Sequence, residues 1–202
     1  MGIAVLVLVV VWFALAAGVR PYLIYRRTGQ VPVPVPTRPG TPQWWARVVS
    51  SIGILFAFGA PIADLFGWLE PIPQLDHDLV RWLGLAIYVL GVSGTLYAQA
   101  AMGVSWLPDI DPGRRTALVT TGPFAVVRNP VLACTAATAA GVALLVPNPF
   151  GVPMFVAVLV AHQIQVKLVE EPYLARVHGE AYRRYAARTG RFVPFLGRFR
   201  PG

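Results

Sequence analysis

Two groups of polar residues stand out in a sequence that is otherwise strongly apolar. The first is the stretch TTGPFAVVRNP at residues 120–130, which contains Arg128, and the second is the acidic pair Glu170 and Glu171. Both groups flank long apolar segments, and charged side chains beside bilayer-depth helices are costly unless they have partners or a function. Together, a guanidinium and two carboxylates would form a polar site for a small, charged, amphipathic molecule. We expect this site at the cytoplasmic end of a helical membrane protein.

The composition identifies the class of protein that must position these residues. The chain has 202 residues, of which 56% are hydrophobic and 13% are charged, whereas an ordinary soluble domain has about 25% charged residues. The mean hydropathy is +0.60. These values predict an all-α integral membrane protein that forms a single membrane domain over residues 1–202, with the lipid bilayer as its partner.

The net charge of +8 comes mainly from arginines that flank the apolar segments. This pattern is typical of cytoplasmic loops that face anionic lipid, and it disfavours nucleic-acid binding. The lone cysteine, Cys134, cannot form an intrachain disulfide. No Cys/His cluster has the spacing of zinc ligands, so no metal site is predicted.

The hydropathy pattern predicts about five transmembrane helices. They cover residues 2–19, 44–69, 79–102, 131–146 and 151–169. A cleaved signal peptide is the alternative for the first, but positive charge follows this segment (Arg20, Arg26, Arg27) and does not precede it. The VPVPVP run at residues 31–36 predicts a stiff polyproline connector. Five crossings place the N-terminus outside and the C-terminus in the cytoplasm, in what we expect to be a bacterial plasma membrane.

The last two apolar segments should form a C-terminal helical hairpin. Pro147, Asn148 and Pro149 lie between them and predict a tight turn. Such a hairpin would return Glu170 to the membrane side of Arg128. Small residues in the third segment, Gly84, Gly91 and Gly94, predict close helix packing.

A further helix is predicted after the acidic pair. Pro172 disfavours helical angles at Glu171, so the fifth span should end or kink there. Pro172 suits the first turn of a new helix and Gly190 suits its end. Within it, Leu174, Val177, Ala181 and Tyr185 recur at helical spacing, which predicts an amphipathic cytoplasmic helix.

Six short motifs follow one another from Gln99 to Pro194. They are MGVSW (Met102–Trp106), LVTTGPF (Leu118–Phe124), VRNP (Val127–Pro130), VEEPYL (Val169–Leu174), HGEAYRRY (His178–Tyr185) and RFVP (Arg191–Pro194). In order and spacing they resemble the isoprenylcysteine carboxyl methyltransferase-like membrane methyltransferases, which also resemble phospholipid N-methyltransferases. The family pattern usually has Arg-His-Pro-x-Tyr where this chain has Asn129 and Leu132, and Phe-Gly where it has His178-Gly179.

The resemblance implies S-adenosylmethionine as the methyl donor, bound on the cytoplasmic side. It implies a cofactor-binding core over residues 99–194, with variable helices on the substrate side over residues 1–98. Arg128 would pair with the donor's carboxylate, and Glu170 or Glu171 would balance its sulfonium or accept from its ribose or ammonium. Arg128, Glu170 and Glu171 form the predicted catalytic group. The predicted cofactor site is Gly122, Pro123, Phe124, Arg128, Asn129, Pro130, Glu170, Glu171, Tyr182 and Tyr185, and the predicted substrate site is Gln99, Met102 and Trp106.

The acceptor implied is a lipidic or amphipathic small molecule with a carboxylate, thiol or amine. Asn129 cannot titrate as the usual histidine would, which favours an acceptor that ionises readily, such as a carboxylate or thiol. Two other functions stay open. One is an NADPH-dependent membrane reductase of the steroid-reductase type. The other is a non-catalytic scaffold or transporter, although transporters place polar groups near the midplane and here they gather at the inner helix ends.

Overall fold

The computed structural model describes residues 1–29, 36–103 and 117–199, and the regular elements in these ranges are helical. In chain order they are α1 (Gly2–Phe13), η1 (Ala14–Val19), α2 (Arg20–Thr28), α3 (Pro42–Leu65), α4 (Asp78–Met102), α5 (Pro123–Val126), α6 (Pro130–Leu145), α7 (Gly151–Ile164), η3 (Gln165–Glu170) and α8 (Glu171–Arg188), where η marks a π-helical segment. Trp106, Arg114, Arg115 and most of the VPVPVP connector lie outside the described residues.

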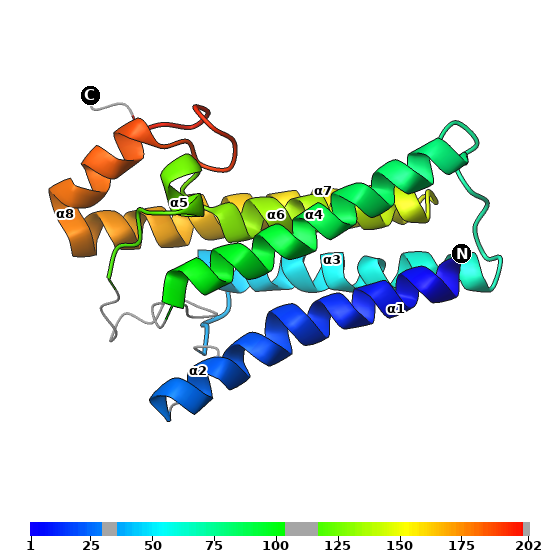
Figure 1. Ribbon diagram of the computed structural model, residues 1–202, viewed down its shortest axis with the longest axis horizontal. Helices are drawn as coiled ribbons and strands as arrows, with labels where there is room; N and C mark the ends of the chain where they lie inside the picture. The colour runs from blue at the N-terminus through cyan, green and yellow to red at the C-terminus, as the bar shows by residue number, and fades with distance from the viewer. Residues whose placement is uncertain (30–35, 104–116, 200–202) are drawn as a thin grey trace.

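The long helices run side by side and form an elongated bundle. The N-terminus lies at one end of this bundle, and α5, α8 and the C-terminal segment gather at the other (Figure 1). Four helices of the described chain are long and apolar enough to cross a membrane: Gly2–Arg26, Pro42–Leu65, Asp78–Met102 and Gly151–Arg188. The shorter apolar helix α6 lies among them. The prediction of an all-α integral membrane fold is therefore confirmed.

Glycines allow α4 and α6 to pack with their backbones in close contact. A Cβ atom added at Gly91 would lie 2.6 Å from the backbone nitrogen of Thr138, and one added at Gly141 would lie 2.6 Å from that of Tyr88. Lipid tails are as apolar as leucine, so helices in a bilayer associate through such close contacts rather than through the hydrophobic effect. The packing role predicted for Gly84 and Gly91 is confirmed, since Gly84 also meets α6.

The connection between α6 and α7 is fixed by a buried asparagine. Asn148 is 2% exposed. Its Nδ2 donates to the carbonyl of Ala60 in α3 over 2.8 Å, and its Oδ1 accepts from the backbone N–H of Phe150 over 3.1 Å. The short turn is thus bonded to a third helix as well as to itself.

The helix that carries the acidic pair does not break at Pro172, contrary to the prediction. Glu171 keeps helical angles, with φ −61° and ψ −43°, and the helix continues from Gly151 to Arg188. A proline ring clashes with the carbonyl four residues earlier and lacks an N–H. The π-helical segment η3 ends at Glu170, two residues before Pro172, and its wider turn accommodates the ring. The same arrangement recurs in the first helix, where η1 ends at Val19 before Pro21, so that helix continues to Thr28.

The prediction of which residues form the apolar face of α8 is also wrong for the second half of that helix. Gly179 has φ +52° and ψ −126°, a conformation that favours glycine, and it kinks the helix. Beyond the kink Ala181 is exposed, whereas Tyr182 and Ala186 are buried. The kink rotates the buried face, which a constant helical period does not anticipate. Figure 1 shows the second half of α8 turned back towards α5.

Candidate active site

The segment around Arg128 is held against the end of α8 by backbone contacts. Gly122, with φ +59°, precedes Pro123, which begins the short helix α5. After α5 the chain becomes extended, and Val127 forms an isolated parallel bridge with Gly190. The N–H of Arg128 donates to the Gly190 carbonyl over 2.8 Å. Residues about 60 positions apart thus lie side by side.

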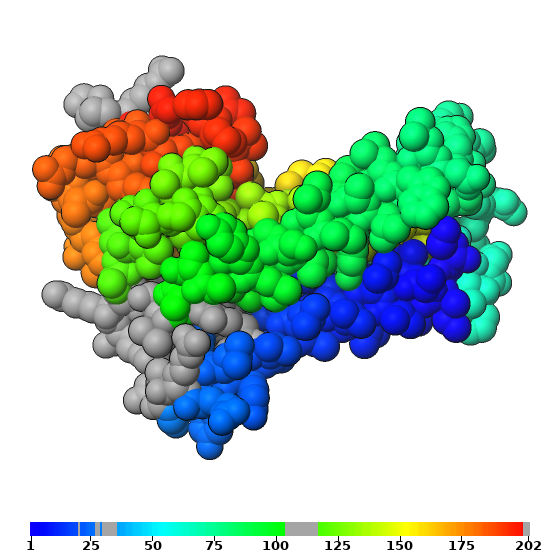
Figure 2. Space-filling view, viewed as in Figure 1, coloured from blue at the N-terminus to red at the C-terminus, as the bar shows by residue number. Residues whose placement is uncertain are grey.

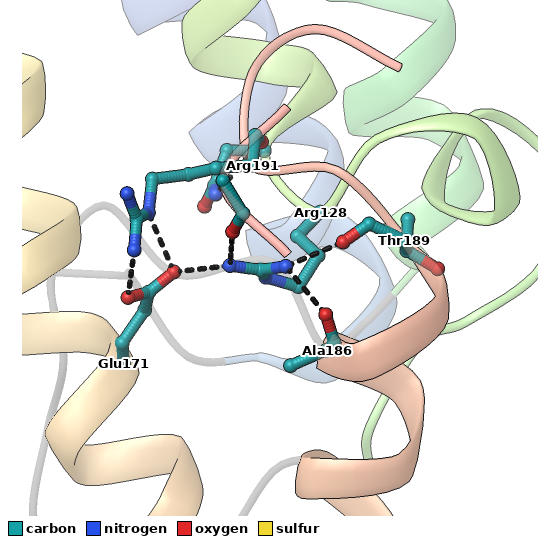
Figure 3. Close-up of polar contacts among 7 residues, drawn as sticks. Arg128, Glu171, Ala186, Thr189 and Arg191 are labelled. Carbon is teal, nitrogen blue, oxygen red and sulfur yellow. Dashed lines mark hydrogen bonds and ion pairs between the residues drawn. The ribbon is translucent and has the colours of Figure 1, made fainter. Parts of the chain in front are cut away.

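Arg128 is the centre of a buried hydrogen-bond network (Figure 3). Its side chain is 3% exposed. Nη1 donates to the carbonyls of Ala186, over 3.0 Å, and Thr189. Nη2 donates to Glu171 Oε1 over 2.6 Å and to the Gly197 carbonyl over 3.0 Å. Both terminal nitrogens are therefore engaged by protein oxygens. Nε is buried and has no protein partner among the described residues.

Glu171 lies between two arginines. Arg191 donates to it in a bidentate fashion, from Nε to Oε1 and from Nη2 to Oε2, over 2.8 Å each. Arg128 bonds the same Oε1 on its other side. The hydrogen bonds with Glu171 raise the pKa of Arg191 above its ordinary value. Two guanidinium groups thus bond the single carboxylate of Glu171.

Other contacts bind the walls of the site to one another. Glu170 accepts from Gln165 Nε2 over 3.1 Å. Asn129 donates to the Arg191 carbonyl through both its backbone N–H, over 3.0 Å, and its Nδ2, over 3.1 Å. The Tyr185 hydroxyl donates to the Phe124 carbonyl over 2.6 Å. The Asn129 bonds join the start of α6 to the C-terminal segment, and the Tyr185 bond joins α8 to α5.

A cavity of about 270 Å³ opens beside this network. Ten of its lining residues belong to the predicted cofactor and substrate sites: Gln99, Met102, Phe124, Arg128, Asn129, Pro130, Glu170, Glu171, Tyr182 and Tyr185. Gly122 and Pro123 do not line it and instead start the helix that carries Phe124. Trp106 lies outside the described residues.

Two features of the site were not predicted. The first is Arg191, which forms the bidentate pair with Glu171. This residue belongs to the RFVP motif, but no role in the site was predicted for it. The second is an apolar wall formed by Leu118, Val119 and Leu174, which completes the cavity. The cavity thus combines charged, aromatic and apolar surfaces.

In the space-filling view the C-terminal segment and the chain around α5 form one lobe at this end of the molecule (Figure 2).

The acidic pair lies about one bilayer thickness from the start of its helix. The helix from Gly151 to Arg188 has 38 residues, about 57 Å at 1.5 Å per residue. Glu170 lies about 30 Å along it, a distance close to the thickness of the hydrocarbon core. The charged cluster therefore falls at the end of the apolar span rather than at its middle.

Comparison with known proteins adds independent information. A family model described as phospholipid methyltransferase matches residues 79–181, about half of the chain. Phosphatidylethanolamine N-methyltransferase of Rattus norvegicus is 34% identical over 116 residues, which are 56% of each chain. The nickel-cobalt-cadmium resistance protein NccN of Alcaligenes xylosoxydans xylosoxydans is 28% identical over 120 residues, 59% of this chain and 55% of that one. The chain thus spans little more than half the length of these curated relatives.

A solved structure shares the fold. The eukaryotic intramembrane Ras methyltransferase, isoprenylcysteine carboxyl methyltransferase, superposes with a TM-score of 0.62 at 20% sequence identity. The match covers 90% of this chain and 62% of that one. The helical arrangement described above is therefore one that a known membrane protein adopts.

Proposed function

The chain belongs to the phospholipid methyltransferase family, and from this premise we propose that it transfers a methyl group from S-adenosylmethionine to a lipidic or amphipathic acceptor at the membrane surface. The observation that carries the proposal is the cavity at the end of the bundle, which combines a carboxylate cluster, aromatic rings and an apolar wall. Residues 99–194 would form the cofactor-binding core. Residues 1–98 would supply helices on the acceptor side.

The chemistry of the lining fits this cofactor. A carboxylate complements a sulfonium or ammonium group, and aromatic rings suit an adenine. Glu170 provides the first, and Phe124, Tyr182 and Tyr185 provide the second. Arg128 also lines the cavity, and its buried Nε lacks a protein acceptor among the described residues. The cavity volume is close to the lower end of the range for ligand pockets, roughly 300–1,000 Å³.

The contacts favour different roles for the two carboxylates. Glu171 is engaged by Arg128 and Arg191, so its charge is already balanced. Glu170 also lines the cavity and accepts from Gln165 Nε2. Because Glu171 is already held by two guanidinium groups, we assign Glu170 as the carboxylate that meets the cationic part of the cofactor. Glu171 and Arg128 act as positioning residues that hold the C-terminal segment.

Methyl transfer is an in-line displacement in which alignment and water exclusion supply most of the catalysis. When bound, S-adenosylmethionine supplies an electrophilic methyl group on a positively charged sulfur. The chain's part is to hold the acceptor in line and to keep water away. The apolar wall and Phe124 exclude water, and Gln99 and Met102 on α4 would orient the acceptor. Because α4 is a candidate membrane span, the acceptor would enter from the lipid.

The distribution of arginines indicates how the chain is oriented in the membrane. Positive charge concentrates on the cytoplasmic side of membrane proteins. The C-terminal end of the bundle is rich in arginine, including Arg183, Arg184, Arg188, Arg191 and Arg198. We therefore propose that the site and the C-terminus face the cytoplasm of a bacterial plasma membrane, and that the N-terminus faces outward.

Titration calorimetry of the detergent-purified protein with S-adenosylmethionine and with S-adenosylhomocysteine tests the proposal. We expect saturable binding of both, with no stabilisation by NADPH in a thermal-shift assay. Glu170→Gln should weaken S-adenosylmethionine more than S-adenosylhomocysteine, because only the former carries the sulfonium charge. Glu180→Gln, an exposed change on α8, is the matched control. Absence of binding by a protein that unfolds cooperatively would contradict the assignment.

A transfer assay tests the acceptor separately. Labelled methyl donor is incubated with the purified protein and three lipidic acceptors that carry a carboxylate, a thiol and an amine. Transfer to one of them, abolished by heat-unfolding the protein, is the expected result. Binding of the cofactor without transfer to any acceptor or to a total lipid extract would argue against an enzymatic role.

A further inference from the structure

Gln99 is a buried amide in the lining of the cavity whose carbonyl oxygen has no hydrogen-bond partner among the described residues. The residue is 4% exposed and lines the cavity from α4. Its Nε2 donates to the carbonyl of Ala16 in η1 over 3.4 Å. Its Oε1 is buried and has no hydrogen-bond partner in the described part of the chain. The donation to Ala16 thus leaves the oxygen as the unpaired atom of the amide.

An unpartnered buried carbonyl oxygen is unusual, because the large majority of buried side-chain polar atoms are hydrogen-bonded. Such an atom loses its water on folding and recovers that loss only when a donor approaches. Cavities that bind small molecules are mostly apolar, with a few polar groups that fix the orientation of the ligand. Gln99 Oε1 has the position and the chemistry of such a group, since it accepts and does not donate.

We propose that Gln99 is a specificity-determining residue whose Oε1 accepts a hydrogen bond from an N–H or O–H group of the ligand in this cavity. The inference deepens the proposed function and rests on it. Two molecules in the proposed reaction carry such donors: the cofactor, through its ribose hydroxyls and amino groups, and an acceptor with an amine or hydroxyl. A ligand that lacks a donor at this point would leave the oxygen unpaired and would bind more weakly.

Thr95 provides an internal comparison. It lies one helical turn before Gln99 on α4, is 1% exposed, and its Oγ1 also has no partner in the described part of the chain. Thr95 does not line the cavity. Loss of its hydroxyl therefore perturbs the same buried helix face without touching the ligand. Thr95→Val keeps the shape of the side chain and is the matched control for a change at Gln99.

The experiment compares Gln99→Met and Thr95→Val in the detergent-purified 202-residue chain. Calorimetry measures the Kd of S-adenosylhomocysteine. Transfer from labelled S-adenosylmethionine to a lipid extract, at increasing extract concentration, gives the KM and the maximal rate. Gln99→Met should raise either the Kd or the KM about tenfold, the change expected for one hydrogen bond. Thr95→Val should stay close to wild type, because Thr95 does not line the cavity.

The outcomes separate the possible donors. A raised Kd for S-adenosylhomocysteine identifies the cofactor as the donor, and a raised KM with an unchanged Kd identifies the acceptor. If Gln99→Met matches wild type in both quantities, the oxygen serves only water and the proposal is overturned. An equal loss in Thr95→Val would likewise overturn it, because the effect would then belong to the helix face. If wild type binds no cofactor, it is the proposed function that fails.

Discussion

Arg191 holds Glu171 through two hydrogen bonds of 2.8 Å, although the residues lie 20 positions apart, Glu171 at the start of α8 and Arg191 beyond its end. The pair closes a loop in which the end of the chain returns to the helix that carries the acidic pair (Figure 3). Gly197, further along the same segment, accepts from Arg128. The C-terminal segment is thus bonded to two separate walls of the cavity, which makes its order a condition for the site.

The first prediction concerns this pair. Arg191→Met should destabilise the protein by about 1–3 kcal/mol, because it removes two charge-assisted hydrogen bonds from a carboxylate that is largely buried. Arg191→Lys should recover little, since an ammonium cannot reproduce a bidentate fork. Thermal unfolding in detergent measures both. Because the segment bonds Arg128 and Glu171, which line the cavity, S-adenosylhomocysteine should also bind more weakly. Unchanged stability and affinity would show that the pair contributes nothing.

Arg128 should be more sensitive still. Arg128→Met would remove four hydrogen bonds, three to backbone carbonyls and one to Oε1 of Glu171, which would keep its bond from Arg191. Removing one partner from a buried charged network typically costs about 3–5 kcal/mol. We expect a large drop in the unfolding temperature or a failure to accumulate folded protein. Arg184→Met, an exposed change on α8, should behave like wild type. A variant at position 128 with wild-type stability would contradict the network in Figure 3.

The helical class and the approach of Arg128 to the acidic pair could be predicted from sequence because each depends on simple periodicities. Apolar runs of bilayer length define spans, and a turn between two of them returns the chain to one side. The continuation of both helices through Pro21 and Pro172 could not be predicted in this way, because it depends on π-helical segments that hydropathy does not reveal. The burial of Tyr182 instead of Ala181 depends on the kink at Gly179.

The hydrogen-bond partners of Arg128 could not be predicted from the sequence either. The sequence indicated that a guanidinium at this point needs anionic or polar partners. Three of the partners are backbone carbonyls, of Ala186, Thr189 and Gly197. Every residue has a carbonyl, so no residue type marks these positions. Only the bridge between Val127 and Gly190, which aligns the two segments, determines which carbonyls face the side chain.

The hydroxyl of Tyr185 offers a smaller test of how α5 is held. It donates to the Phe124 carbonyl over 2.6 Å, and both residues line the cavity. Tyr185→Phe should cost about 0.5–1.5 kcal/mol of stability, the usual net value of one such bond. It should also weaken cofactor binding, because Phe124 loses its anchor. Calorimetry and thermal unfolding measure these effects. Tyr25→Phe, at an exposed position in α2, is the control and should change neither.

The contact between α4 and α6 gives the last prediction, which concerns the scaffold. A Cβ atom at Gly91 would lie 2.5 Å from Thr138 Oγ1 and 2.6 Å from the Thr138 backbone nitrogen. A rotation of the Thr138 side chain could relieve the first clash, but the second involves the backbone and requires the helices to move. Gly91→Ala must therefore separate the two helices, and overpacking of this kind costs about 1–3 kcal/mol. Since α4 carries Gln99 and α6 begins beside Arg128, the separation should also widen the cavity and lower cofactor affinity.

Gly18→Ala is the matched control, because nothing lies within 4 Å of the added Cβ atom. It makes the same chemical change in another apolar helix, so any difference between the variants reports the close approach alone. Thermal unfolding in detergent and binding of S-adenosylhomocysteine should fall together for Gly91→Ala and stay at wild-type values for Gly18→Ala. Equal behaviour of the two variants would mean that α4 and α6 do not pack through this glycine, and the cavity would then need another support.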